Sequence, residues 1–215
     1  MSIEKKDRVL IVVNHLTSGE TDYLYRFIEG AGRATAEATL GDDYVRLVKL
    51  YGGHATRADF LAALRAEGAK ASVKRIDVLL MLHGEEGRVV FHDGSAKTST
   101  LAGDISALSL RGKLRLMYST CCFGDSHSAD WLSAGFDTAI GSKKVNANSA
   151  VELAPLLSLW QFNFKVSECL APTIPPTGPN DEVARIYGRA HNLGWKDKVD
   201  SSKVVRGDAN LRISS

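Results

Sequence analysis

The sequence has little cysteine, little excess charge and no long apolar run, and each shortage excludes a class of protein. Its three cysteines include the adjacent pair Cys121 and Cys122, so a disulfide framework is unfavourable and we expect reduced thiols. The 27 basic and 25 acidic residues are spread without a basic block, so nucleic acid is not an expected partner. The N-terminal stretch MSIEKKDRVLIVVNH is too briefly apolar for a signal peptide or a membrane span. We therefore expect a cytoplasmic protein with no membrane partner.

Length and composition favour one globular domain. The chain has 215 residues, of which 44% are hydrophobic and 24% charged, as is ordinary for a protein with one sizeable core. Neither an internal repeat nor a shift in composition divides it, so we expect a single domain over residues 1–215. The proline-rich segment 171–181 is expected to be a loop before a C-terminal helix and tail.

Apolar, β-branched segments alternate with stretches of helical periodicity. The first segment, RVLIVVN, is typical of a strand buried on both faces. Capping-box spacings at Thr17, Thr56 and Ser149 indicate helix starts. The alternation predicts an α/β fold with a doubly wound, mostly parallel sheet and helices on both faces. The strands predicted to be central are residues 8–14, 44–51, 76–82, 114–119 and 138–142.

The stretch after the third of these strands interrupts the alternation. His83-Gly84 is followed by the charged turn Glu85-Glu86-Gly87, a short apolar run and the turn-forming pair Asp93-Gly94. This pattern predicts a small β-hairpin in place of a crossover helix. The hairpin would lie beside the end of the strand that leads to His83.

Reactive side chains follow two of the predicted strands, His83 after residues 76–82 and Cys121 after residues 114–119. The carboxyl ends of strands in an open α/β sheet line the crevice where ligands bind. A thiol and an imidazole that meet there indicate nucleophilic catalysis on a carbonyl. The sequence holds no C-x-x-C or H-x₃-H array, so neither a metal nor another cofactor is expected. We interpret His127 as a surface or helix-start residue.

Two motifs resemble those of the caspase-fold (clan CD) cysteine peptidases, nearest to the CHAT and separase-like group. They are LLMLHG at residues 79–84 and LMYSTCCFG at residues 116–124, and the similarity covers residues 8 to about 160. The resemblance implies a caspase-like fold and a His83–Cys121 dyad. It also implies that the backbone N–H groups of Gly84 and Cys121 hold the oxyanion.

The adjacent cysteines leave the nucleophile open to two assignments. The stretch STCCFG matches the S-A-C-x-x-G pattern of the CHAT group in register, which favours Cys121. A shorter C-x-G spacing, as in caspases, would place the nucleophile at Cys122. Because side chains alternate along a strand, we expect only one of the two to share a crevice with His83.

The expected specificity pocket departs from the family pattern. Relatives in this group usually carry an acidic residue after the fifth strand to recognise arginine, whereas this chain has Asn146 and Asn148 there. A neutral amide does not offset the desolvation of a buried guanidinium as a carboxylate does. We therefore expect weak cleavage after arginine unless Glu152 or Asp125 reaches the pocket.

Three functions from different classes compete. The favoured hypothesis is a cysteine endopeptidase acting on a protein or peptide substrate, in one version inactive until an activating protein partner orders its loops. The second is a catalytically silent caspase-fold module that binds peptides or proteins. The third is a small α/β protein that senses redox state through its cysteine pair. Both reactive residue types are present, which favours the first, and the lack of C-x-x-C disfavours the third.

Overall fold

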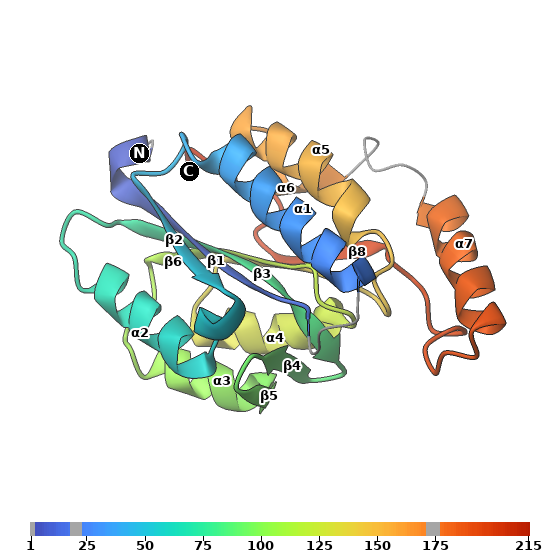
Figure 1. Cartoon of the computed structure of the whole chain (residues 1–215). Coiled ribbons are helices and arrows are strands. Elements are labelled where there is room, and N and C mark those ends of the chain that lie inside the picture. Colours follow the sequence, from blue (N-terminus) through green and yellow to red (C-terminus); the bar gives the residue numbers. More distant parts are fainter. Residues whose placement is uncertain (1–2, 18–22, 171–176) are drawn as a thin grey trace.

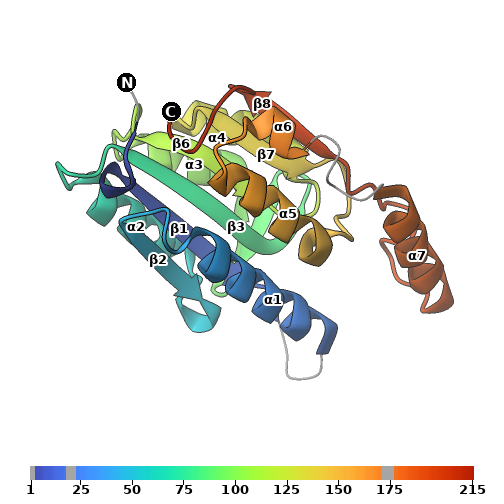
Figure 2. The ribbon, with the colours of Figure 1, turned by 90° about the horizontal axis from the view of Figure 1, so that it is seen from above.

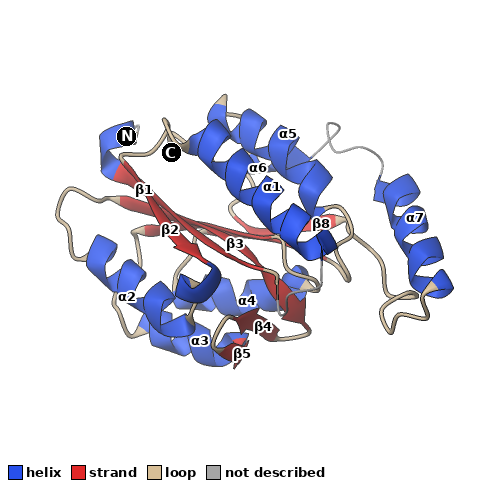
Figure 3. Ribbon diagram, viewed as in Figure 1, coloured by secondary structure: helices blue, strands red, loops and turns tan. Residues whose placement is uncertain are grey.

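An eight-stranded sheet forms the centre of the molecule (Figures 1 and 3). The computed structural model describes residues 3–17, 23–170 and 177–215 of the chain. The strand order is β2-β1-β3-β6-β7-β8, and the hairpin β4–β5 is attached to β3. The strands are β1 (Arg8–His15), β2 (Arg46–Tyr51), β3 (Arg75–Glu85), β4 (Arg88–Phe91), β5 (Gly94–Lys97), β6 (Leu114–Ser119), β7 (Thr138–Ser142) and β8 (Lys203–Gly207).

The predicted parallel arrangement of the central strands is confirmed. β1 pairs in parallel with β2 and β3, β3 pairs with β6, and β6 pairs with β7. The Val, Ile and Leu runs of β1, β3 and β6 are buried, as expected for strands that have helices on both sides. The predicted hairpin is also confirmed, because β4 pairs antiparallel with both β3 and β5. His83 lies within β3, since this strand continues past the parallel sheet into the hairpin.

Helices cover both faces of the sheet (Figures 1 and 2). One face carries α1 (Tyr23–Leu40), α5 (Ser149–Gln161) and α6 (Val166–Leu170), and the other carries α2 (Arg57–Gly68), α3 (Thr98–Ser106) and α4 (Gly124–Ala134). Each face has its own buried apolar cluster. Short 3₁₀ helices occur at Lys5–Asp7 and Gly52–His54. Within the described residues, no helix combines the length and the apolar character needed to cross a membrane.

The helix-capping predictions have three different outcomes. Thr56 caps α2 as predicted, and its side chain accepts a hydrogen bond from the Asp59 N–H at 3.0 Å. The capping box at Ser149 is wrong: Asn148 precedes the first turn of α5 without a side-chain cap, and the Glu152 carboxylate pairs with a lysine instead. The box that begins at Thr17 extends into residues 18–20, which lie outside the described part of the chain.

The C-terminal part contains the predicted helix, which begins earlier than expected, and a strand that the sequence did not indicate. α7 (Thr177–Ala190) begins inside the segment 171–181, so the loop prediction is wrong from residue 177 onward, and residues 171–176 lie outside the described part. Pro179 stands in the first turn of α7, where proline is tolerated. β8 pairs antiparallel with β7 and forms the edge of the sheet, and α7 lies outside the layered body of the protein (Figures 1 and 2). The short, partly polar sequence of β8 gave no clear strand pattern.

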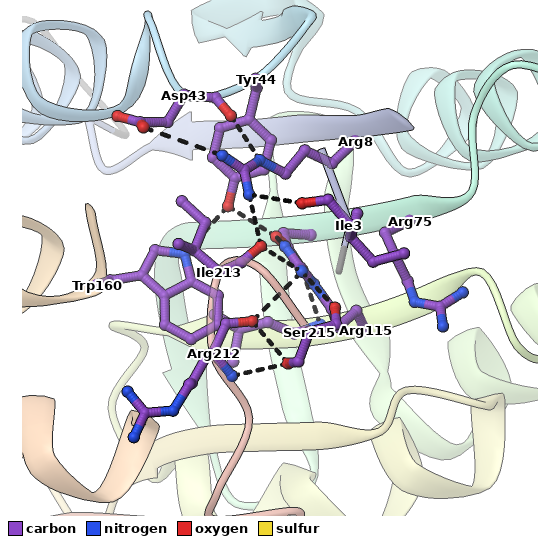
Figure 4. Close-up of polar contacts among 12 residues, drawn as sticks. Ile3, Arg8, Asp43, Tyr44, Arg75, Arg115, Trp160, Arg212, Ile213 and Ser215 are labelled. Carbon is purple, nitrogen blue, oxygen red and sulfur yellow. Dashed lines mark hydrogen bonds and ion pairs between the residues drawn. The ribbon is translucent and has the colours of Figure 1, made fainter. Parts of the chain in front are cut away.

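A buried ionic cluster fixes the amino-terminal ends of β3 and β6 (Figure 4). Asp77 and Arg115 form a fully buried ion pair, in which Arg115 Nε lies 2.9 Å from Asp77 Oδ1. The Tyr44 hydroxyl donates to the same carboxylate at 2.6 Å. Arg115 and Arg8 both donate to the carbonyl oxygen of Ile213, each at 2.7 Å. The cluster therefore ties the C-terminal segment to the end of the sheet that lies opposite the carboxyl ends of the parallel strands.

Candidate active site

A cavity of about 830 Å³ opens beyond the carboxyl ends of β1, β3 and β6. Its lining comes from segments far apart in the sequence: the chain after β1, helix α1, the end of β3, the turn after β6, the loop between β7 and α5, the start of α5, helix α7 and the segment that follows α7. This is the position expected for a ligand site in an open α/β sheet.

Cys121 does not reach the cavity, so the prediction that it shares a crevice with His83 is wrong. Its side chain is 0% exposed and belongs to the apolar cluster on the α2–α4 side of the sheet. The Cys121 sulfur lies 3.9 Å from the Leu80 carbonyl oxygen, and burial raises its pKa to about 11. At neutral pH this side chain is a protonated thiol without access to solvent, which is the behaviour of a small core residue.

Cys122, and not Cys121, is the cysteine that reaches the cavity. It is partly exposed and lines the cavity together with His83 and Gly84. The two cysteines do enter different environments, as side-chain alternation predicts, but their assignment is reversed. The Asn146 backbone N–H donates to the Cys122 sulfur at 3.4 Å. Burial nevertheless raises the Cys122 pKa, so the resting group is a thiol that needs a base.

Gly124, whose spacing in the sequence favoured Cys121 as the nucleophile, has a packing role. After β6 the chain turns at Phe123, whose φ of 57° lies in the left-handed region, and it enters α4 at Gly124. A Cβ on Gly124 would lie 2.8 Å from the Cα of Gly141 in β7. The close contact of the two backbones requires glycine there. The spacing from cysteine to glycine reflects this contact and does not identify the cysteine that faces the cavity.

The imidazole of His83 is oriented by a backbone carbonyl. Its Nε2 lies 2.6 Å from the Leu16 carbonyl oxygen, and the ring packs edge-on against Tyr25 of α1 with the centroids 4.6 Å apart. Because a carbonyl oxygen can only accept, Nε2 carries the proton. Nδ1 is then the basic nitrogen of the neutral ring.

Glu29 of α1 supports the segment that carries this carbonyl. Its buried carboxylate accepts the backbone N–H groups of Leu16 at 3.0 Å and Thr17 at 3.2 Å, and it pairs with Arg33 one turn later. A helix side chain thus fixes Leu16, and the Leu16 carbonyl fixes His83. Sequence reasoning missed Glu29, because nothing in a helical pattern shows which loop a helix will touch.

Replacing Glu29 with glutamine is expected to loosen the His83 ring. One end of an amide is a donor, so it cannot both accept the two backbone N–H groups and face Arg33. We expect a loss of about 1–3 kcal/mol in the free energy of unfolding by urea. ¹⁵N NMR should show that His83 no longer keeps a single Nε2–H tautomer. The matched control is Glu37→Gln on the same helix. It breaks a more exposed pair with Lys49 of β2 and should cost less than about 1 kcal/mol. An unchanged His83 tautomer in Glu29→Gln would contradict this support.

Gly84 lies against the turn that carries the cysteines. A Cβ at this position would lie 2.4 Å from the Cys122 carbonyl oxygen and 2.9 Å from the Cys121 Cβ, so only glycine fits. The prediction that the Cys121 N–H is the second oxyanion donor is wrong, because this N–H already donates to the buried Ser119 Oγ at 3.3 Å. Gly84 therefore stays beside the cavity, whereas Cys121 contributes neither its sulfur nor its N–H.

The residues predicted for the specificity pocket divide into two pairs. Asn146 and Asn148 line the cavity, but Glu152 and Asp125 do not. Glu152 is buried in an ion pair with Lys203 at 2.7 Å, and Asp125 pairs with Arg206 of β8 at 2.9 Å. The suggestion that either acid could reach the pocket is therefore wrong, because each already has a cationic partner.

Glu152 does not line the cavity, but it holds Asn146, which does. Its Oε1 accepts the side-chain amide of Asn146 at 3.2 Å and the Tyr118 hydroxyl at 3.3 Å. The same Asn146 amide donates to the Thr120 carbonyl at 3.0 Å. These bonds hold Asn146 where its backbone N–H meets the Cys122 sulfur.

His127 stands in the first turn of α4, which agrees with the helix-start interpretation, but it is buried, so the alternative of a surface residue is wrong. Its Nε2 lies 2.7 Å from the Glu85 carbonyl oxygen, and burial lowers the pKa of the ring. The contact ties the hairpin next to Gly84 to α4. Across the described ranges, no group of three or more His, Cys, Asp or Glu side chains is placed to hold a metal ion.

Comparison with known proteins bears on the fold. No protein-family model matches the sequence, and no curated protein matches it either. The crystal structure of caspase-1 from Spodoptera frugiperda is similar, with a TM-score of 0.61 at 12% identity over 95% of this chain and 88% of that one. The fold is caspase-like. The Arg-specific cysteine proteinase gingipain R is similar with a TM-score of 0.55 at 12% identity; 97% of this chain is covered, but only 48% of that chain. The nearer grouping with CHAT and separase-like proteins stays a prediction.

Proposed function

We propose that the chain is a cysteine endopeptidase with Cys122 as nucleophile and His83 as general base. The observation that carries the proposal is that a partly exposed thiol lines the same cavity as an imidazole whose Nε2–H is held by a carbonyl. The caspase-like fold, shared with a cysteine proteinase, supports the same chemistry. The proposed reaction is thus the one that the sequence predicts, but the proposed nucleophile is Cys122 in place of Cys121.

The proposed reaction follows from these groups. His83 Nδ1 takes the thiol proton of Cys122 as the sulfur attacks the carbonyl carbon of the peptide bond. The carbonyl oxygen becomes an oxyanion, for which the N–H groups of Gly84 and Cys122 are the proposed donors. The C–N bond breaks as His83 returns the proton to the leaving amine, and water then hydrolyses the thioester with His83 as base. The Leu16 carbonyl stabilises the imidazolium that forms between these steps.

Hydrolysis of a fluorogenic peptide library tests the proposal. His83→Ala is expected to lower kcat/KM by about 10²–10⁴-fold, the usual contribution of a general base. His54→Ala, which removes an exposed histidine that does not line the cavity, is the control and should leave turnover unchanged. Equal turnover by the wild type and His83→Ala would remove His83 from the mechanism. Peptides that bind but stay intact would favour the silent peptide-binding module.

A further inference from the structure

The carboxylates behind the cavity wall are shielded from the cavity by asparagines. Glu152 accepts the amide of Asn146 at 3.2 Å, and Asp181 accepts the amide of Asn148 at the same distance. Both asparagines line the cavity, whereas Glu152 and Asp181 are buried and do not. Glu152 is neutralised by Lys203, and Asp181 also accepts the hydroxyl of a buried serine at 2.6 Å. The wall next to Cys122 thus presents amides where an arginine-binding pocket would present an acid.

Few charged groups face the cavity elsewhere. Among the described lining residues, Glu85 is the only carboxylate and Lys198 the only ammonium group. A guanidinium or carboxylate that binds against Asn146 and Asn148 would therefore lose water without gaining a partner of opposite charge from that wall. That exchange is unfavourable for either sign of charge.

Large apolar side chains line the outer part of the cavity and are open to solvent. Val183 and Tyr187 of α7 are 66% and 49% exposed, and Val151 of α5 is 50% exposed. Tyr25 and Ile28 of α1 add to the same lining. α7 stands away from the layered body of the protein in two perpendicular views (Figures 1 and 2). Exposed apolar surface gathered around a cavity is typical of an interaction site.

We infer that this apolar groove, bounded by α1, α5 and α7, receives the substrate as a polypeptide segment with uncharged, large apolar or aromatic side chains near the scissile bond. The inference rests on the proposed function, because Cys122 lies in the same cavity. Cys122 lines the same cavity as Val183 and Tyr187, so a peptide whose carbonyl carbon reaches the Cys122 sulfur enters the space that these side chains border. Its apolar side chains would cover Val183, Tyr187 and Val151, and α7 forms the outer wall of the substrate site.

Peptide binding to the full-length Cys122→Ser variant tests the inference without requiring turnover. The probes are fluorescein-labelled hexapeptides that differ at one central position, which is Phe, Leu, Arg or Asp, and fluorescence anisotropy gives each Kd. The Phe and Leu peptides are expected to bind at least tenfold more tightly than the Arg and Asp peptides. Tighter or equal binding of a charged peptide, or no binding of any peptide, would overturn the inference.

Two substitutions on α7 provide a matched pair in the same Cys122→Ser background. Val183→Glu places a charge on the groove wall and is expected to weaken binding of the Phe peptide at least tenfold. Ile186→Glu changes a similarly exposed residue of the same helix that does not line the cavity, and it should alter Kd less than twofold. Equal effects of the two substitutions would overturn the inference. The chain could instead form a dimer through this groove. If Val183→Glu dissociates such a dimer and leaves peptide binding unchanged, the groove binds a second copy of the chain and the inference is overturned.

Alkylation of the wild-type chain by iodoacetamide separates this inference from the proposed function. The reagent is too small to need the groove, so labelling of Cys122 reports on the nucleophile alone. Labelled Cys122 with a preference for charged peptides would overturn the groove assignment and leave the peptidase intact. Selective binding of apolar peptides with an inert Cys122 would support the groove and refute the peptidase.

Discussion

Replacing Cys122 with alanine is expected to reduce peptide hydrolysis and active-site labelling to background, whereas Cys121→Ala should keep both. The Cys122 sulfur lines the cavity that His83 also lines, and the Asn146 N–H donates to it. Cys121 is fully buried in the apolar core, so its thiol has no route to a substrate carbonyl. Initial rates with the fluorogenic peptide library and with a peptidyl acyloxymethyl ketone measure the difference.

The controls for this prediction are the other two cysteines. Cys121→Ala removes one buried sulfur atom and should cost roughly 1 kcal/mol of folding stability without loss of turnover. Cys169→Ala does the same in the core on the opposite face of the sheet. Turnover that survives Cys122→Ala and disappears in Cys121→Ala would restore the assignment favoured by the sequence.

Replacing Asp77 with asparagine should lower the free energy of unfolding by about 3–5 kcal/mol, because it leaves the buried Arg115 guanidinium without its counter-charge. The same carboxylate also accepts the Tyr44 hydroxyl and the Leu116 N–H, and an amide cannot accept all of these bonds. Urea denaturation followed by far-UV circular dichroism measures the loss. Asp77 stands at the end of β3 opposite His83, so the fraction that stays folded should still be labelled at Cys122.

An exposed ion pair provides the comparison for Asp77. Asp125→Asn breaks the contact with Arg206, whose side chain is largely open to solvent, and should cost no more than about 1 kcal/mol. A loss below 1 kcal/mol for Asp77→Asn would show that the buried cluster at the C-terminal segment does not hold the sheet together.

The sheet could be predicted because its signals are local. The Val, Ile and Leu runs of the central strands and the turn residues of the hairpin each act over a few neighbouring residues. The order of these segments then fixes a parallel sheet and delivers His83 and the cysteine pair to its carboxyl ends. The region of the site thus followed from pattern alone.

The details of the site could not be predicted, because they depend on contacts between distant segments. Glu152 has the spacing of a capping residue, but it forms a buried ion pair with Lys203 of β8. Gly124 has the spacing of a catalytic motif, but its contact with Gly141 explains it. Glu29 supports His83 only through a loop. In each case the residue contacts a segment that is distant in the sequence, so the local sequence pattern does not predict the contact.

The alkylation rate of each cysteine, mapped by mass spectrometry, tests the central claim that Cys122 and His83 act as a pair in one cavity. The wild type is treated with limiting peptidyl acyloxymethyl ketone carrying an apolar P1 residue, and His83→Ala is treated in parallel. We expect that the label lies on Cys122 alone and that His83→Ala slows its formation at least tenfold. A label on Cys121, or a rate at Cys122 that does not depend on His83, would contradict it.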